Sequence, residues 1–515
     1  MKQYDVVVIG AGVVGCAIAR ELSRYHLKTL VLEKELDVAT GNSSRNTGML
    51  HAGFTYKLGT LRAHCSVEGN QEFDQVAAEL GVPFKRTGKL VVGFTDHDKQ
   101  NILRFKANGE ANGVKGIRMI DQDEMHAIEP NAGGNFAMYV PASGILDPMQ
   151  YTIGLAENAC KNGVEFSFGS QVTGIAHLDG EKDYAKLAQL NLKPGYLTKG
   201  KDYYQVTTNR GMVLTRWVIN SAGAYAVKIG QLMGYPYVYQ LGVKGEYYVL
   251  DKKAGAFLKT PVYPAPNDQG GFATHATPTV DGNILVGPDW YLTPDPEDYA
   301  NTQNSLDGLF RDGRKMFSKM ERQYFIRNFA GIRWRNADPV TKEFQDFKIM
   351  TDENIPNTVS LVGIESPGIT SALPLARRVR TIILSHEEER GSKVQENETF
   401  DPIRKPIRRF ADMTIDEKIE AIQENPDYGQ VFCRCENVSR AEILQAIHNP
   451  LGVHTLTGIK NRTRSMMGRC QGGYCQTRIT QLMEQELGLA PEDLRYQREG
   501  GWIFTGKVRE SSEEE

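Results

Sequence analysis

The sequence predicts an α/β domain of the Rossmann-like type that is interleaved with an antiparallel α+β domain and followed by a small helical domain rich in cysteine. Three observations lead to this prediction. An apolar run, a glycine-rich turn and a helical pattern open the chain. Strand–turn–strand patterns such as "ATPTVDGNILVG" occur in its middle. Four of the 7 cysteines form two close pairs in the last fifth of the chain.

Length and composition limit the choice of class. A chain of 515 residues is too long for one compact domain and favours two or three. Its net charge of −3 argues against a nucleic-acid-binding protein. No apolar run approaches the roughly 20 residues that a membrane-spanning helix needs, and no signal peptide is visible. We therefore expect a cytoplasmic protein without a transmembrane segment, whose paired cysteines bind a metal or act in redox chemistry.

The first predicted element is the strand "YDVVVIG", an apolar and β-branched run typical of buried parallel strands. Gly10, Gly12 and Gly15 follow in the spacing G-x-G-x-x-G, and a helical pattern comes next. Such glycines permit the tight bend, the approach of the backbone to a pyrophosphate and the close packing of helix on strand. The second strand ends at Glu33, whose carboxylate suits a ribose hydroxyl. This order predicts a dinucleotide site and leaves flavin and nicotinamide both open.

Later segments resemble a known family. They are "ATGNSSRNTGMLHAGFTYKLGTLRA", "WVINSAGAYA", "HATPTVDGNILVGPDW", "FAGIRWRNAD" and "LVGIESPGITSALPLARRV". Together with the glycine turn they resemble the D-amino-acid-oxidase-type flavoproteins, in the branches of the 2-hydroxyglutarate oxidases and the glycerol-3-phosphate oxidases and dehydrogenases. The resemblance extends from residue 1 to about 385. It implies bound FAD and an FAD-dependent oxidoreductase that acts on CH–OH donors.

The resemblance also implies which residues hold the cofactor. They are Gly10, Gly12, Gly15 and Glu33 for the ADP moiety, Ser43, Ser44 and Asn46 for the phosphates and the ribityl chain, Val172 for adenine, and Gly363, Gly368 and Ile369 for the flavin.

Two further residues are implied as catalytic. His51 matches a histidine that the family is thought to use as a base, and Arg333 matches an arginine that binds an anion. Histidine suits the removal of a hydroxyl proton because its pKa lies near neutrality, and the forked guanidinium of arginine suits an anionic substrate. We expect only one of Arg333 and Arg335 to reach the substrate, with the other in a surface ion pair. His275 is a weaker candidate for the same pocket.

Several functions remain open for a small anionic substrate. Oxidation of glycerol 3-phosphate to dihydroxyacetone phosphate leads, and 2-hydroxyglutarate is a close alternative. An amino-acid or amine oxidase and, from another class, a non-catalytic electron-transfer subunit are also considered. Some glycerol-3-phosphate oxidases carry a lysine beside the pocket where this chain has Gly270 and Gly271, which favours the hydroxyglutarate alternative unless Lys244 compensates.

The domain boundaries follow from composition and from the resemblance. Residues 1–385 would form the flavoprotein, in which about 75–145 and 225–345 are the substrate domain. The charged segment 386–425 is expected to be a solvated linker, 426–490 a cysteine-rich domain and 491–515 a tail that ends in the disordered "ESSEEE". The polar stretch from 178 to 206 is expected to be an insertion or long hairpin.

The last predicted domain is defined by Cys433, Cys435, Cys470 and Cys475, in the pattern C-x-C, 34 residues, C-x4-C. Four thiolates can hold an iron–sulfur cluster or zinc. With "RTRSMMGRCQGGYC", this spacing resembles the bacterioferritin-associated-ferredoxin-like [2Fe-2S] domain. The resemblance implies that electrons leave through the cluster to an acceptor protein or partner subunits, and it leaves open a peripheral attachment to the membrane through them. A zinc-binding or metal-free module is the alternative.

Overall fold

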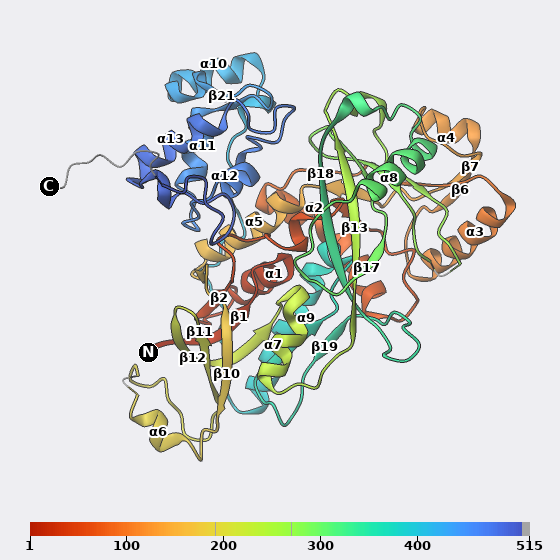
Figure 1. The fold of residues 1–515 in the computed structure, drawn as a ribbon. Coiled ribbons are helices and arrows are strands. Elements are labelled where there is room, and N and C mark those ends of the chain that lie inside the picture. The colour runs from red at the N-terminus through yellow and green to blue at the C-terminus, as the bar shows by residue number, and fades with distance from the viewer. Residues whose placement is uncertain (191, 269, 507–515) are drawn as a thin grey trace.

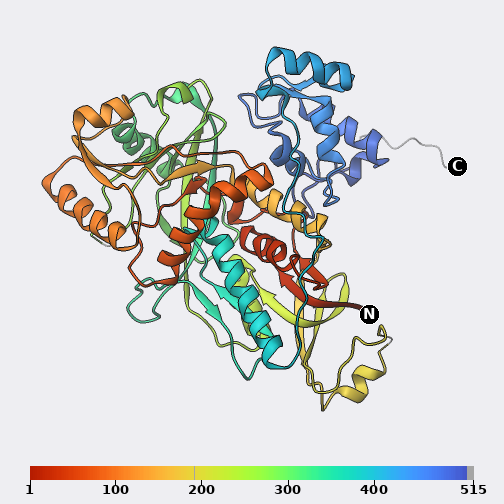
Figure 2. The same cartoon turned by 180° about the vertical axis from the view of Figure 1, so that it is seen from behind.

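The computed structural model of the protein describes residues 1–190, 192–268 and 270–506. Within these ranges the chain forms two large sheets with their helices and a separate helical module near the C-terminal end (Figure 1). The same view from behind shows that the module lies at one end of the molecule and the loop around α6 (Tyr184–Ala188) at the other (Figure 2). The predicted fold class is confirmed in all three parts.

The first sheet belongs to the predicted α/β domain. Strand β1 lies between β2 and β12 and runs parallel to both, and β20 continues the parallel part beside β12. The long strand β12 also pairs with β11, which forms an antiparallel hairpin with β10. The strands are β1 (Lys2–Ile9), β2 (Thr29–Leu32), β9 (Glu165–Ser167), β10 (Val172–Leu178), β11 (Tyr203–Thr208), β12 (Gly211–Asn220), β19 (Lys348–Met350) and β20 (Thr358–Val362).

Both faces of this sheet are buried, which explains the continuous apolar run of β1. Val6 and Val8 lie in the core beneath α1, α5 and α9, whereas Val7 and Ile9 face α7. The helices are α1 (Val13–Leu22), α2 (Leu61–Leu80), α5 (Pro148–Lys161), α7 (Ala226–Met233) and α9 (Gly368–Glu389). Helix α1 begins directly after the glycine turn and packs on α5 and α9, so the turn is held between sheet and helices.

The second sheet is antiparallel apart from the pairing of β14 with β5. Its strands are β5 (Leu90–Gly93), β6 (Arg118–Asp121), β7 (Phe136–Tyr139), β13 (Gln240–Leu250), β14 (Val262–Pro264), β15 (His275–Pro278), β16 (Ile284–Gly287), β17 (Tyr291–Thr293) and β18 (Phe325–Asn336). Helices α3 (Asp96–Ala111), α4 (Gln122–Ile128) and α8 (Gln303–Met316) accompany it. The predicted turn between β15 and β16 is present, and Gly282 adopts φ +89° there. These strands all fall within the segments 75–145 and 225–345.

Smaller elements complete the part of the chain that precedes the C-terminal module. Strands β3 (Met49–Leu50), β4 (Phe84–Lys85) and β8 (Gly144–Leu146) form a short sheet behind the loop that carries His51. The polar stretch expected to be an insertion does connect two paired strands, β10 and β11, with α6 between them.

The expectation of a solvated linker over 386–425 is wrong in part. Helix α9 continues to Glu389, and α10 (Ile415–Glu424) forms where no element was expected. Arg404 is buried in an ion pair with Glu157, at 2.8 Å, and Phe410 and Ala421 share a small core. Isolated apolar residues between charges gave no periodic signal, yet Phe410, Met413 and Ala421 are buried in this small core.

The C-terminal module consists of a short hairpin and helices. These are β21 (Val431–Cys433), β22 (Val438–Ser439), α11 (Arg440–Ile447), α12 (Leu456–Thr463) and α13 (Gln476–Leu487). A capping box of Ser439 and Glu442 begins α11. Helix α12 packs on α5, and its Arg462 forms an ion pair with Asp37 of the first domain, at 2.7 Å. The predicted disordered end "ESSEEE" lies outside the described residues.

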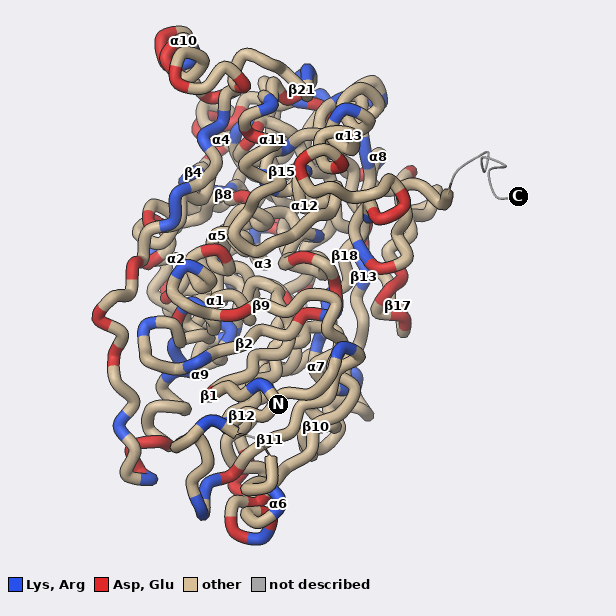
Figure 3. Tube along the Cα trace, turned by 90° about the vertical axis from the view of Figure 1, so that its left-hand side faces the viewer, with Lys and Arg blue, Asp and Glu red and all other residues tan. Residues whose placement is uncertain are grey.

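Charge is distributed along the chain without a segment of one sign that dominates. Figure 3 shows basic and acidic residues interspersed over both the two-sheet part of the molecule and the C-terminal module. Among the described helices, none has both the length and the apolar character of a membrane span.

Candidate functional site

A cavity of about 1200 Å³ lies between the two sheets. Its lining comes from the glycine turn, the loop of residues 40–47, the end of β12, strand β18 and the start of α9. A cavity of this size, at the end of parallel strands, is the usual location of a ligand in an α/β fold.

The glycine turn meets the steric demands that its spacing predicted. Gly10 has φ +102°, and a Cβ there would lie 2.8 Å from the carbonyl oxygen of Ser221. A Cβ at Gly15 would overlap the carbonyl oxygen of Gly10, so only glycine lets α1 lie this close to the turn. Gly10 and Gly12 line the cavity, whereas Gly15 lies behind it as a packing residue.

Glu33 and Ser43 are anchored beside this turn. The Glu33 carboxylate accepts hydrogen bonds from the N–H groups of Ala11, at 2.7 Å, and Glu35, at 2.9 Å. Burial raises the pKa of Glu33. The Ser43 hydroxyl accepts a hydrogen bond from the N–H of Val13, at 2.9 Å, at the N-terminus of α1. Both side chains line the cavity, where they could serve an ADP moiety.

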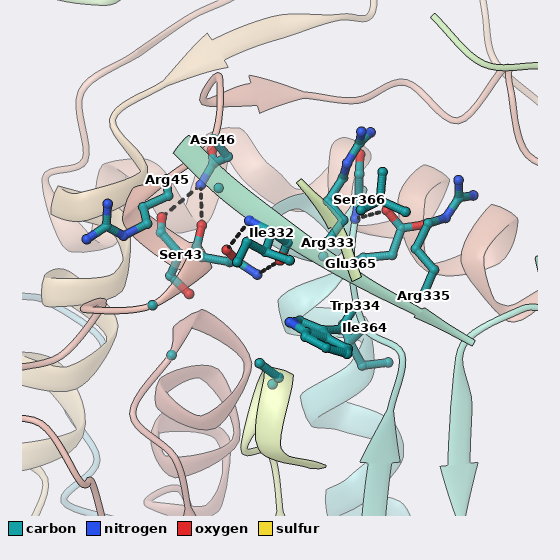
Figure 4. Close-up of a pocket in the computed structure, with 18 of the residues that line it drawn as sticks. Ser43, Arg45, Asn46, Ile332, Arg333, Trp334, Arg335, Ile364, Glu365 and Ser366 are labelled. Atoms are coloured by element: carbon teal, nitrogen blue, oxygen red, sulfur yellow. Dashed lines mark hydrogen bonds and ion pairs between the residues drawn. The ribbon is translucent and has the colours of Figure 1, made fainter. Parts of the chain in front are cut away.

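Of the other residues predicted to hold FAD, some line the cavity and others do not. Val172, Gly368, Ile369 and Asn46 line the cavity. The Asn46 amide already donates to the carbonyl groups of Asn42 and Ser43 (Figure 4).

Two of the predicted cofactor residues are outside the lining. Ser44 is not among the lining residues, because in the turn Asn42–Ser44 its hydroxyl bonds back to Gly41. Gly363 is also outside the lining; it has φ +73°, and a Cβ there would overlap the side chain of Asn336. Its role is therefore in packing.

His51 lies in the wall of the cavity, and its imidazole is in the neutral form. Its backbone N–H donates to the Thr370 hydroxyl, at 3.0 Å, and its imidazole Nε2 lies 3.3 Å from the Ser366 hydroxyl. Burial, and then the charge of Lys89, lower the pKa of His51 to about 3. The imidazole is therefore neutral near neutrality and can accept a proton.

Arg333 is an unpaired cation beside this histidine's cavity. Across the ranges that the structure describes, its guanidinium has neither an ion pair nor a hydrogen bond. Asn42 fixes the strand next to it, because its side-chain oxygen accepts from the N–H of Ile332, at 3.0 Å, and its amide donates to the Ile332 carbonyl group (Figure 4). Such an arrangement suits the binding of an anion.

The expectation for Arg335 is wrong. Arg333, Trp334 and Arg335 all line the cavity. The two arginines project from one side of β18 and Trp334 projects from the other, as expected for alternating residues of a strand (Figure 4). The Arg335 guanidinium pairs with Glu365, at 3.1 Å, and Glu365 also pairs with Arg62, at 2.8 Å. Glu365 is only 4% exposed, so this is a buried cluster and not a surface pair.

Lys244 and His275 were the other candidates for the substrate pocket, and their contacts show which of them lines the cavity. Lys244 is buried, bonds to Asp298 at 2.7 Å and does not line the cavity, so it does not compensate for Gly270 and Gly271. His275 does line the cavity, and its ring stacks on Tyr263 with centroids 3.6 Å apart. Burial lowers the pKa of His275 far below its ordinary value.

Sequence reasoning missed three cations of this region. Arg45 lines the cavity with its guanidinium 4.1 Å from the centroid of the Tyr299 ring. Arg498 reaches the cavity from the last described segment and pairs with Glu297, at 2.8 Å. Lys89 lies behind the aromatic wall near His51. Arg45 stands in a quoted motif, but Arg498 and Lys89 carried no local signal.

The four predicted cysteines come together in the C-terminal module. Cys433 contacts Cys475, and Cys435 contacts Cys470. The hydrogen bond from Cys475, with those of backbone N–H groups, lowers the pKa of Cys433 to about 6. The thiols contact one another in two pairs. Among the described residues, no group of three or more potential metal ligands is close enough together to hold one metal ion.

The surroundings of the thiols fit an iron–sulfur cluster. Backbone N–H groups of Met466, Glu436 and Gly472 point at sulfur atoms, as cluster sulfurs require. A Cβ at Gly468 would overlap the Cβ of Cys435, so this glycine permits the close approach of the two loops. The remaining cysteines, at positions 16, 65 and 160, are separate and free.

Comparison with known proteins agrees with this two-part geometry. Residues 5–381 match the family model described as FAD dependent oxidoreductase, and residues 431–485 match the BFD-like [2Fe-2S] binding domain. The chain is 34% identical over 508 residues to a glycerol 3-phosphate dehydrogenase of Caloramator mitchellensis, covering 98% of this chain and 99% of the relative. It is 31% identical over 329 residues to the mitochondrial L-2-hydroxyglutarate dehydrogenase of Nematostella vectensis, covering 62% of this chain and 70% of the relative.

A solved structure is similar as well. The L-α-glycerophosphate oxidase from Mycoplasma pneumoniae with FAD bound superposes with a TM-score of 0.68 at 26% identity, over 78% of this chain and 99% of that one.

Proposed function

The chain belongs to the FAD dependent oxidoreductase family, and from that premise we propose that it oxidises glycerol 3-phosphate to dihydroxyacetone phosphate. It is an FAD-dependent enzyme that also has a [2Fe-2S]-binding domain. The observation that carries the proposal is that one cavity contains both a neutral buried histidine, His51, and an arginine without an ion pair among the described residues, Arg333. The full-length similarity to a glycerol 3-phosphate dehydrogenase, module included, supports the same substrate.

In this proposal His51 is the base. Oxidation of a secondary alcohol removes the proton from the hydroxyl oxygen and a hydride from the carbon atom that bears the hydroxyl group, and FAD, when bound, supplies the hydride acceptor. His51 would accept the hydroxyl proton at Nε2, the atom that faces the Ser366 hydroxyl. Its lowered pKa keeps that nitrogen unprotonated before the substrate arrives.

Arg333 would bind and orient the anionic end of the substrate. Arg62 and Arg335 are both held in ion pairs with Glu365, so they are less available to a ligand than Arg333. The free guanidinium of Arg333 would instead pair with the phosphate and so fix the distance from the hydroxyl group to His51.

The cysteine module would then connect the flavoenzyme to an acceptor. Cys433, Cys435, Cys470 and Cys475 would hold the [2Fe-2S] cluster, which supplies one-electron transfer when bound. Cys435 and Cys470 are exposed, whereas the other two are buried, so an acceptor protein would approach on the side of the exposed pair. Because all four must be thiolates, we propose that the protein works in a reducing cytoplasm.

Oxidation of 2-hydroxyglutarate is the second candidate. It is favoured by the 31% identity to an L-2-hydroxyglutarate dehydrogenase and by the glycines at positions 270 and 271 of the cavity wall. Both candidate substrates are anionic hydroxy compounds, so His51 and Arg333 would have the same roles in either reaction.

The test is turnover of a substrate panel with a dye acceptor. We expect the highest kcat/KM with glycerol 3-phosphate, a lower value with L-2-hydroxyglutarate and none with amino acids. Arg333→Met should raise the KM for glycerol 3-phosphate by about a hundredfold, since loss of a desolvated charge pair costs roughly 2–5 kcal/mol. The exposed Arg311→Met serves as the control and should leave KM unchanged. Activity on amino acids alone would reject the proposal.

A further inference from the structure

Lys89 is a buried ammonium without a counter-ion. It directly precedes β5 and is 1% exposed, and across the described residues its Nζ has no hydrogen-bond partner. Aromatic rings surround it: Nζ lies 3.5 Å from the ring centroid of Tyr263, 4.9 Å from that of Phe272 and 5.3 Å from that of Phe54. The faces of aromatic rings attract a cation, but this attraction is weaker than the hydration that the ammonium loses on burial or than an ion pair with a carboxylate.

The position of this lysine links it to the cavity. Tyr263 and Phe272 also line the cavity. His275 lines it as well, and its ring stacks on that of Tyr263. The charge of Lys89 lowers the pKa of both His51 and His275, so its field reaches the place where the substrate would lie. Arg333 lowers the pKa of His275 as well.

Lys89 and Arg333 thus act on the same part of the cavity from different parts of the chain. Lys89 has no carboxylate partner among the described residues, and Arg333 forms no ion pair there, although its charge lowers the pKa of Glu365. The neighbouring Arg62 and Arg335, by contrast, share Glu365. A pair of unpaired positive charges beside one apolar wall is unfavourable in the free protein and becomes favourable when a doubly charged anion enters, because Coulomb attraction is strong in a poorly solvated site.

We propose that Lys89 is the second positive charge of the substrate subsite, acting across the Tyr263 ring, and that with Arg333 it selects a dianionic group of the phosphate type. This inference rests on the proposed function for the nature of the substrate. Lys89 does not touch the ligand in this arrangement, so it is a positioning residue whose charge stabilises the bound anion. Entry of the anion favours the protonated lysine, so a Lys89 side chain that is a neutral amine before binding takes up one proton from the solvent at Nζ.

The pH dependence of binding follows from the groups packed around Lys89. Burial lowers the pKa of Lys89 to about 7. The pKa of His51 is about 3 and that of His275 is well below its ordinary value, both through burial, so neither titrates above neutrality. Burial raises the pKa of Tyr263, and Arg333 stays charged. Anion binding should therefore be tight where Lys89 is protonated and should weaken as pH rises above its pKa.

Sulfate is the probe, because it is a tetrahedral dianion that does not change its own protonation near neutrality. Its binding to the full-length, FAD-loaded protein would be followed through the visible flavin spectrum. For the wild type we expect the Kd to rise by up to about tenfold per pH unit above about pH 7, as linkage to one proton requires. Lys89→Met should bind at least about tenfold more weakly at low pH and show a flat profile.

Three further variants keep the test sharp. Lys89→Gln repeats the loss of charge with a polar side chain, in case the methionine variant folds poorly. Lys89→Arg keeps a charge that does not titrate, so it should restore binding without the pH dependence. Lys99→Met removes an exposed lysine and should behave as the wild type. If Lys89→Met and Lys89→Gln lower only the Tm and keep the wild-type sulfate profile, Lys89 is structural and the inference is overturned.

The same measurements separate this inference from the proposed function. A wild type that oxidises no hydroxy substrate but binds sulfate with the profile that depends on Lys89 would retain the subsite and reject the function. Turnover of glycerol 3-phosphate with an unchanged KM in Lys89→Met would retain the function and reject the subsite.

Discussion

A buried arginine of α12 is one of the residues that attach the cysteine module to the first domain. The Arg462 guanidinium of α12 binds both carboxylate oxygens of Asp37, at 2.7 and 3.1 Å, and lies 3.6 Å from Glu157. All three side chains are at most 9% exposed. Arg462→Met keeps the length of the side chain and leaves the buried carboxylate of Asp37 without a cation, whereas Glu157 keeps its ion pair with Arg404. Breaking a buried ion pair on one side costs about 3–5 kcal/mol, and we expect that loss in the docking of the module.

Arg469 provides the matched control at the same interface. It pairs with Asp251 at 3.3 Å, but its side chain is 56% exposed, so Arg469→Met should cost only about 0–1 kcal/mol. In urea titrations, the flavin signal and the iron–sulfur absorbance should change together in the wild type and in Arg469→Met.

In Arg462→Met the iron–sulfur signal should be lost at lower urea than the flavin signal. Stopped-flow reduction by substrate should keep its flavin rate, whereas electron arrival at the cluster should slow. Coincident transitions at the wild-type midpoint in Arg462→Met would refute this account of the interface.

Three other outcomes are expected. His51→Ala should lower kcat about 10²–10⁴-fold, the range for a lost general base, while FAD content stays unchanged; because the pKa of His51 is lowered to about 3, the wild-type kcat/KM should show no loss from His51 protonation until strongly acid pH. Gly15→Ala should abolish FAD retention, measured as bound flavin per chain, because the added methyl group would overlap the Gly10 carbonyl oxygen; normal flavin content would contradict this packing role. Arg498→Ala should speed FAD loss on dilution, since the ion pair with Glu297 closes one wall of the cavity; an unchanged rate would assign Arg498 to the surface.

The elements that the sequence predicted well are those determined by neighbours in the chain. The strand, glycine turn and helix at residues 4–22 are specified by a local apolar pattern and by the absence of side chains at Gly10 and Gly15. The grouping of four cysteines was visible for the same reason, because each pair is close in sequence.

Contacts between distant parts of the chain were beyond sequence reasoning. Arg498 reaches a cavity whose other lining residues lie between positions 9 and 369, and Lys89 becomes unusual only because three rings from other segments enclose it. Likewise, Ser44 belongs to a polar motif but turns away from the cavity within a single turn of helix. The error over Arg335 was different in kind, since strand geometry alone puts it on the same face as Arg333.

The most direct test of the whole account is the visible spectrum of the purified protein, recorded without oxygen before and after glycerol 3-phosphate is added. We predict flavin bands together with broader iron–sulfur absorbance, a stoichiometry of one FAD and two iron atoms per chain, and bleaching of both signals by the substrate. A colourless protein, or a yellow one whose flavin bands do not respond to glycerol 3-phosphate, would contradict it.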